Sequence, residues 1–138
     1  SMTSKCLCIE TRSAANRLTR LYDDALAPAG ITVTQFSLLN TIREADSPTQ
    51  TALAQMTNLD RSTLARNVKA LAAKNLLNIV AGRDARTRKI TLSQHGMQAL
   101  KAGVPLWLDV QSRLENKLGS ERRALLAELL NDLTAAEA

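Results

Sequence analysis

The apolar positions between residues 61 and 73 recur at the spacing of an amphipathic helix. Leu64, Val68 and Leu71 stand at i, i+4 and i+7, so they form one stripe that can be buried. Asp60, which precedes the stripe, is a residue type that caps helix N-termini. The pattern predicts a helix that begins after Asp60 and turns a polar set toward solvent, made of Arg61, Ser62, Thr63, Arg66, Asn67 and Lys69.

The helical period stops after Lys74, and two short strands are predicted to follow. Residues 75–82 are mostly apolar and end on a glycine, and residues 90–92 alternate apolar and polar side chains. The segment between them is basic and contains an expected tight turn. Its basic residues are Arg83, Arg86, Arg88 and Lys89. We therefore expect a β-ribbon with a positively charged tip.

Further helical stretches precede this segment. A long helix is predicted over 8–27, and a second begins near the cap candidate Thr34. A short helix over 49–58, with Leu53 and Met56 inward, then leads into the amphipathic helix. A short helix, a tight connection and a longer amphipathic helix are the succession that helix-turn-helix geometry requires.

The chain becomes helical again after Ser93. Pro105 lies inside this pattern and is expected to kink or interrupt the helix, because it lacks an amide donor. Ser120 is a cap candidate for a last helix. The apolar stripe of that helix consists of Leu125, Leu126, Leu129, Leu130 and Leu133. The first and last helices have no evident partner within one winged-helix unit, so we expect them to pair with each other and with a second copy.

Positive charge is concentrated in one part of the chain. Residues 60–89 contain eight Lys or Arg and two Asp, a net +6, whereas the remainder has ten basic and eleven acidic residues, a net −1. A charge run alone is also typical of a solvated face, but here it coincides with the helix-turn-helix pattern and suits a surface that displaces counterions from a polyanion. No aromatic residue lies in this window, which disfavours base stacking on single strands. Duplex DNA is the predicted partner.

Other classes of function find little support in the residues. One histidine, His95, two neighbouring cysteines, Cys6 and Cys8, and scattered carboxylates form neither a catalytic set nor a four-ligand zinc site. We therefore expect no enzyme, no metal and no cofactor. No run reaches the roughly 18 apolar residues that a membrane span needs, and no signal segment opens the chain, so we expect a cytoplasmic protein without a membrane partner.

The two motifs together resemble the MarR family of bacterial transcriptional regulators. LDRSTLARNVKALAAKNLL, residues 59–77, is similar to the family's recognition helix and the strand that follows it. DARTRKITLSQHG, residues 84–96, resembles the family's wing, and LAPAGITVTQFSLL, residues 26–39, resembles the turn after its long first helix. The resemblance covers nearly the whole chain. It implies a triangular homodimer in which the wing arginine, Arg86 here, enters the minor groove and Asp84 orients it.

We therefore expect a single domain over 1–138, mainly α with a small β-hairpin wing. A winged helix-turn-helix lobe is expected over 33–92, and a helical dimerisation lobe over 6–30 and 94–136. The expected function is sequence-specific regulation of transcription, by a repressor that reads a pseudo-palindromic operator as a homodimer and is released by a small-molecule or redox signal. A non-specific architectural DNA-binding protein is the alternative. The expected DNA contacts are Arg61, Ser62, Thr63, Arg66, Asn67, Lys69, Arg83, Asp84, Arg86 and Arg88.

The resemblance also suggests two places where a signal could act. A small anionic or aromatic effector is expected between the two lobes, near Arg12, Asn16, Phe36 and Trp107. Cys6 and Cys8 are candidates for redox sensing, since some members of the family sense peroxides through a cysteine near the start of the first helix. Those sensors hold the thiolate with nearby tyrosines, whereas the only tyrosine here, Tyr22, lies about four helical turns further along. Simple packing of the cysteines is the alternative.

Overall fold

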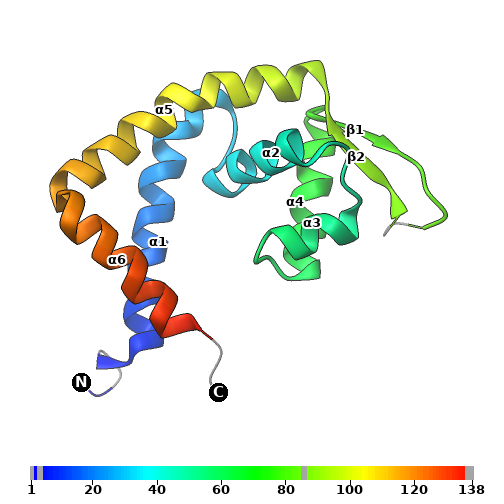
Figure 1. Ribbon diagram of the computed structural model, residues 1–138. Helices are drawn as coiled ribbons and strands as arrows, with labels where there is room; N and C mark the ends of the chain where they lie inside the picture. Colours follow the sequence, from blue (N-terminus) through cyan, green and yellow to red (C-terminus); the bar gives the residue numbers. More distant parts are fainter. Residues whose placement is uncertain (1, 3–4, 85–86, 136–138) are drawn as a thin grey trace.

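The fold is mainly helical, with one antiparallel two-stranded sheet. The computed structural model describes Met2, residues 5–84 and residues 87–135. Its elements in chain order are α1 (Leu7–Leu26), the 3-10 helix η2 (Ala27–Ala29), α2 (Val33–Ala45), α3 (Gln50–Met56), α4 (Arg61–Ala73), β1 (Leu77–Val80), β2 (Lys89–Leu92), α5 (Gln94–Leu118) and α6 (Ser120–Thr134). Figure 1 shows α5 spanning the molecule, with α1 and α6 toward one end and the β-hairpin at the other. This confirms the expected fold class.

The hydrophobic core lies where α2, α3, α4, the sheet and the start of α5 meet. Leu39, Leu53 and Ile90, which come from three different elements, are completely buried. The three apolar residues predicted to face inward from α4 are buried as their spacing requires. Each such side chain stabilises the fold by about 1.5–3 kcal/mol relative to leaving it exposed. The core therefore holds α4 in place and leaves the helix's polar side to solvent.

The predicted cap of helix α2 at Thr34 was wrong, because the N-cap lies two residues earlier in the chain. The cap is Thr32, whose hydroxyl accepts a hydrogen bond from the Gln35 amide at 3.2 Å. The Gln35 side-chain oxygen in turn accepts from the Thr32 amide at 3.1 Å, so the two residues form a capping box. Asp23 of α1 accepts a further hydrogen bond from the Val33 amide at 2.7 Å. The start of α2 is thereby joined to α1.

Two other predictions near helix ends were wrong. Met56 was expected inward but is 55% exposed, because α3 has only seven residues and places just Leu53 in the core. Ser120 was expected to cap the last helix, but the cap position is Gly119, and its φ of +79° lies in the left-handed region that favours glycine. Ser120 is instead the first residue of α6.

Helix α5 runs without interruption through Pro105. Pro105 has no amide hydrogen to donate to the carbonyl of Lys101, one turn earlier in the helix. Lys101 is exposed, so water can donate to this carbonyl in place of the missing amide. Figure 1 shows α5 bending along its length rather than breaking. The expected interruption is therefore absent, and α5 contacts α1, α2, β2 and α6 as one continuous element.

The last helix buries none of its described residues within this chain. Its five leucines are 41–53% exposed. Despite this apolar surface, none of the helices in the described part of the chain is both long enough and apolar enough to cross a membrane.

Candidate DNA-binding face

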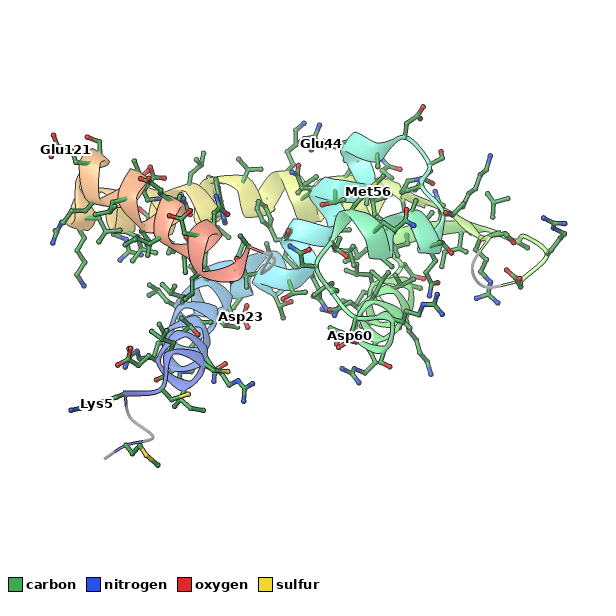
Figure 2. The ribbon with its side chains drawn as sticks, turned by 60° about the horizontal axis from the view of Figure 1, so that its bottom comes forward. Lys5, Asp23, Glu44, Met56, Asp60 and Glu121 are labelled. Carbon is green, nitrogen blue, oxygen red and sulfur yellow. The ribbon has the colours of Figure 1, made fainter. Side chains whose placement is uncertain are left out.

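Helix α4 carries most of the predicted DNA contacts, and Asp60 sets its first turn. The Asp60 carboxylate accepts a hydrogen bond from the Thr63 amide at 2.7 Å. Hydrogen bonds from Thr63 also lower the pKa of this exposed carboxyl below its ordinary value. Figure 1 shows that α4 begins on the side of the molecule away from α5, and Figure 2 marks Asp60 at this end. The first turns of α4 therefore project outward.

The predicted polar residues of α4 divide into two groups. Those exposed on the outward side are Arg61, Ser62, Arg66 and Lys69. Thr63 and Asn67 are half-buried, and the Asn67 amide donates a hydrogen bond to the Thr63 carbonyl at 2.9 Å. The Arg66 guanidinium donates to the Thr63 hydroxyl at 3.2 Å, which holds this long side chain against the helix. The exposed group is better placed to meet a groove than Thr63 and Asn67.

Ala65 also lies on the outward side of α4, and the sequence reasoning did not single it out. It stands one turn after Arg61 and one turn before Lys69, and it is exposed. Its methyl side chain has no hydrogen-bonding group, so the polar pattern of the helix does not include it. The signal available in the sequence was a small apolar residue between basic residues on the predicted outward side. Such an alanine can contact the methyl group of thymine in the major groove.

Lys74 was counted in the basic window, but the structure gives it a different role. Its ammonium donates to the Gly30 carbonyl at 3.0 Å and to the Gln35 side-chain oxygen at 3.2 Å. Gln35 is itself buried, with 6% exposure, and belongs to the capping box of α2. Lys74 thus joins the end of α4 to the start of α2 instead of extending the basic side of α4.

The wing is the hairpin formed by β1 and β2. The strands pair in register from Leu77 opposite Leu92 to Val80 opposite Lys89. The Ile90 amide donates to the Pro48 carbonyl at 2.9 Å, so the second strand is also fastened to the segment before α3. The wing is therefore held against the helix-turn-helix.

The loop of the wing is shaped by Asp84 and Thr87. The Asp84 carboxylate accepts from the Thr87 amide at 3.2 Å, and the Thr87 hydroxyl donates to the Asp84 carbonyl at 3.1 Å. Arg83 and Arg88, on either side of this pair, are exposed. Arg86, and its expected orientation by Asp84, lie outside the described residues. The structure thus places Arg83, Asp84 and Arg88 at the tip of the wing, as expected.

The four residues expected to line an effector pocket lie in two separate places. Phe36 and Trp107 stack, with ring centroids 5.9 Å apart, at a hollow of about 300 Å³ between α2 and α5. Arg12 and Asn16 line a different, shallow hollow on α1. Within one chain, Phe36 and Trp107 therefore form one wall of a candidate effector pocket. Arg12 and Asn16 belong to another surface and do not line that pocket.

Both cysteines are exposed free thiols at the start of α1. Cys6 occupies the N-cap position without a side-chain cap bond, and the Arg12 guanidinium lies 3.9 Å from the Cys8 sulfur. Tyr22 is distant from them along α1, and its hydroxyl donates to the side-chain oxygen of Gln111 on α5. Burial, and secondarily the nearby Glu115 carboxylate, raise the pKa of the Tyr22 phenol. Tyr22 thus links α1 to α5 rather than holding a thiolate.

His95 lies exposed in the first turn of α5, as expected for a surface residue. Among the described residues, no cluster of three or more His, Cys, Asp or Glu side chains has the arrangement to hold a metal ion.

Comparison with known proteins identifies the family of the chain. The model of the MarR family matches residues 29–87. The M. tuberculosis transcriptional regulator MosR, solved in complex with DNA, is 37% identical, the match covering 97% of this chain and 100% of that one with a TM-score of 0.81. A variant of E. coli MarR complexed with operator DNA is 25% identical over 93% of each chain, with a TM-score of 0.82. An HTH-type transcriptional regulator of Bacillus cereus is 28% identical over 116 residues, 83% of this chain and 78% of that protein. The chain therefore belongs to the MarR family of winged helix-turn-helix transcriptional regulators.

Proposed function

We propose that this protein is a homodimeric repressor that recognises a pseudo-palindromic operator. The observation that carries the proposal is the outward side of α4, where three exposed basic residues project from a helix whose first turn is capped by Asp60. A projecting helix of this kind fits the major groove of B-DNA, while the adjacent basic hairpin can reach the flanking backbone or minor groove.

Each side chain is suited to a particular contact. Arg61 and Arg66 carry planar guanidinium groups, which pair with the two acceptors of guanine in the major groove. Lys69, further along the outward side, is suited to a phosphate. Arg83 and Arg88 at the wing tip provide charge for the backbone, and we propose that Arg86 enters the minor groove. The helix thus supplies sequence discrimination, and the wing supplies affinity and shape recognition.

A dimer accounts for the apolar surface at the end of the molecule away from the hairpin. The leucines of α6 are joined there by Leu18 and Leu21 of α1, which are 43% and 40% exposed. Exposed leucines in this number, on the two terminal helices, are typical of an interface rather than of a free surface. A symmetric dimer through these helices would present two copies of α4 about one DNA turn apart, roughly 34 Å.

The aromatic pair between α2 and α5 is the proposed effector site. Phe36 and Trp107 offer flat apolar surface beside Ser37 and Asn40, which suits a small aromatic molecule with a polar or anionic group. Arg12 and Asn16 line a separate hollow on α1 and are not part of this proposed site within one chain. Occupancy of this site between the two lobes is proposed to release the operator.

Selection of bound sequences from a random duplex pool tests the proposal. The selected site is expected to be a pseudo-palindrome, bound by a dimer at least about 10³ times more tightly than a scrambled duplex at physiological salt. Anisotropy titrations at several salt concentrations would separate the specific from the electrostatic component. A pool that yields no shared sequence, together with equal affinity for all duplexes, would show instead an architectural protein that binds without base contacts.

A further inference from the structure

Two neighbouring residues near the end of α1 join this helix to two others. The Tyr22 hydroxyl donates to the Gln111 side chain on α5, and the Asp23 carboxylate accepts from the Val33 amide at the start of α2. Figure 2 marks Asp23 where the end of α1 meets the start of α2. Helix α5 also contacts α2. Each of these three helices therefore contacts the other two, and Asp23 provides a direct hydrogen bond between α1 and α2.

Asp23 satisfies a backbone amide that α2 cannot satisfy itself. Val33 is the first residue of α2, and the amides in the first turn of a helix have no acceptor within that helix. The bond is 2.7 Å long, as expected for a charged acceptor, and the carboxylate lies at the helix end where the macrodipole is positive. Because a hydrogen bond is directional and apolar packing is not, Asp23 fixes where α2 begins relative to α1.

The same end of α2 is also bound to the end of α4. The Gln35 side-chain oxygen accepts from the Thr32 amide at 3.1 Å and from the Lys74 ammonium at 3.2 Å. Gln35 is buried, and Lys74 is the residue that directly follows α4. The start of α2 is thus held to α1 by Asp23 and to α4 by Lys74. A displacement of this point from α1 would carry α4 with it.

Helix α5 by itself is a less rigid connection between the two ends of the molecule. It bends along its length in Figure 1, and Pro105 removes one hydrogen bond from its middle. Gly103, before the proline, packs against α2, whereas Gln111, after it, binds α1. Bending of α5 at Pro105 would therefore swing α4 relative to α1, unless α1 and α2 are joined directly. The Asp23 hydrogen bond is such a joint.

We propose that Asp23 is a positioning residue that sets the distance and angle at which the dimer presents its two copies of α4. This role rests on the proposed dimeric binding of an operator, because a lobe that reads one half-site needs no fixed position relative to α1. Asp23→Ala is expected to leave each lobe able to bind a half-site. The two lobes would be less well preorganised to bind two half-sites together, which lowers affinity for the full operator and relaxes the required spacing.

Anisotropy titrations with three duplexes test the proposal. The first carries both half-sites as selected from the random pool, the second has one half-site scrambled, and the third has two base pairs inserted between the half-sites. The insertion rotates one half-site by about 70°, since a turn takes about 10.5 base pairs, and both changes should weaken wild-type binding. Asp23→Ala is expected to bind the first duplex about 2- to 30-fold more weakly than wild type, as is usual for changes in coupling. It should bind the scrambled duplex like wild type and discriminate less against the insertion.

Two further variants are controls. Asp24→Ala removes the same side chain from the next position, which is exposed and makes no side-chain hydrogen bond or ion pair within the described ranges. It should behave like wild type on all three duplexes. Asp23→Asn keeps an oxygen that can accept from the Val33 amide, so it should recover most of the discrimination against the insertion. Circular dichroism would verify that each variant is folded.

The outcomes separate this role from the proposed function. If Asp23→Ala loses as much affinity for the scrambled duplex as for the first, the residue only maintains the fold of the lobe and the positioning role is overturned. The role is also overturned if this variant rejects the insertion as strongly as wild type does. If wild type itself binds all three duplexes equally, the dimeric reading of two half-sites fails, and the role of Asp23 fails with it.

Discussion

Lys69 lies on α4 and Lys74 caps its C-terminal end five residues later, and the structure predicts that removing their charges has different effects. The Lys69 side chain projects from the outward side of the helix. The Lys74 ammonium is instead hydrogen-bonded to the Gly30 carbonyl and the Gln35 side chain. Lys69→Met and Lys74→Met remove the same charge and keep a similar stem, so each variant is the matched control of the other.

Lys69→Met is expected to reduce the salt dependence of operator binding. Each phosphate contact contributes about 0.9 to the slope of log affinity against log salt. The dimeric variant loses two such contacts, so a fourfold rise in salt should weaken the wild-type protein about 12-fold more than the variant. Lys74→Met is expected to keep the wild-type slope. It should instead lower the free energy of unfolding by on the order of 1 kcal/mol, since its two hydrogen bonds lie near the surface.

Anisotropy titrations between 50 and 200 mM salt would measure the slope, and urea denaturation would measure stability. If the slope of Lys74→Met falls as much as that of Lys69→Met, Lys74 also contacts DNA. That result would refute the assignment of Lys74 to a structural role on the basis of its hydrogen bonds. An unchanged slope for Lys69→Met would remove Lys69 from the DNA contacts.

The remaining predictions concern base contacts, the wing, the dimer and the cysteines. Arg66→Ala should relax base preference at one position of each half-site, at a cost of about 1–3 kcal/mol, and an unchanged selected sequence would contradict this. Arg86→Ala should weaken binding to AT-rich flanks by a similar amount, about 1–3 kcal/mol, with no change in thermal unfolding; equal affinity on these flanks would reject the proposed minor-groove contact. Leu129→Asp should dissociate or unfold the dimer in sedimentation, because it places an unpaired charge in an apolar interface, and a wild-type chain that sediments as a folded monomer would reject the dimer itself. Mild peroxide should lower operator affinity reversibly in wild type but not in the Cys6→Ser, Cys8→Ser double variant; an identical response of both would leave packing as the role of these thiols.

Helix α4 could be predicted from the sequence because its determinants are local. The spacing of Leu64, Val68 and Leu71 specifies which side is buried, and Asp60 specifies where the helix begins. Both features depend on residues within a few turns of one another. The structure accordingly confirms the buried stripe and the cap together.

The start of α2 shows what happens when two local signals compete. Thr32 and Thr34 are both suitable cap residues, and only Thr32 has a glutamine three positions later. The signal for the capping box was therefore present in the sequence at Thr32. The prediction that Met56 faces the core was wrong for a different reason. A helix of seven residues has too few positions for the periodicity to show whether its last side chain is buried.

Lys74 could not have been assigned from the sequence. A count of charges gives each lysine of the basic window the same weight, whereas the partners of Lys74 lie 44 and 39 residues away along the chain. Only the packing of α4 against α2 brings these groups together. The exposed leucines of α6 illustrate the same limit, because an apolar stripe indicates that burial is favourable but not which surface provides it.

Helix α5 joins the leucine-rich end of the molecule to the end that carries α4 and the hairpin. A side chain at Gly96 would overlap the Leu76 carbonyl oxygen, and a Cβ at Gly103 would lie 2.9 Å from the Phe36 ring. The start of α5 is thus packed directly against the segment that follows α4, and its middle against α2. Such close contacts tolerate little sliding of one helix against another. A ligand bound between α2 and α5 would therefore shift α4 relative to α6, because local adjustment could not accommodate the displacement. In a dimer joined through α6, the same shift would change the distance between the two copies of α4, and with it their fit to half-sites of fixed spacing.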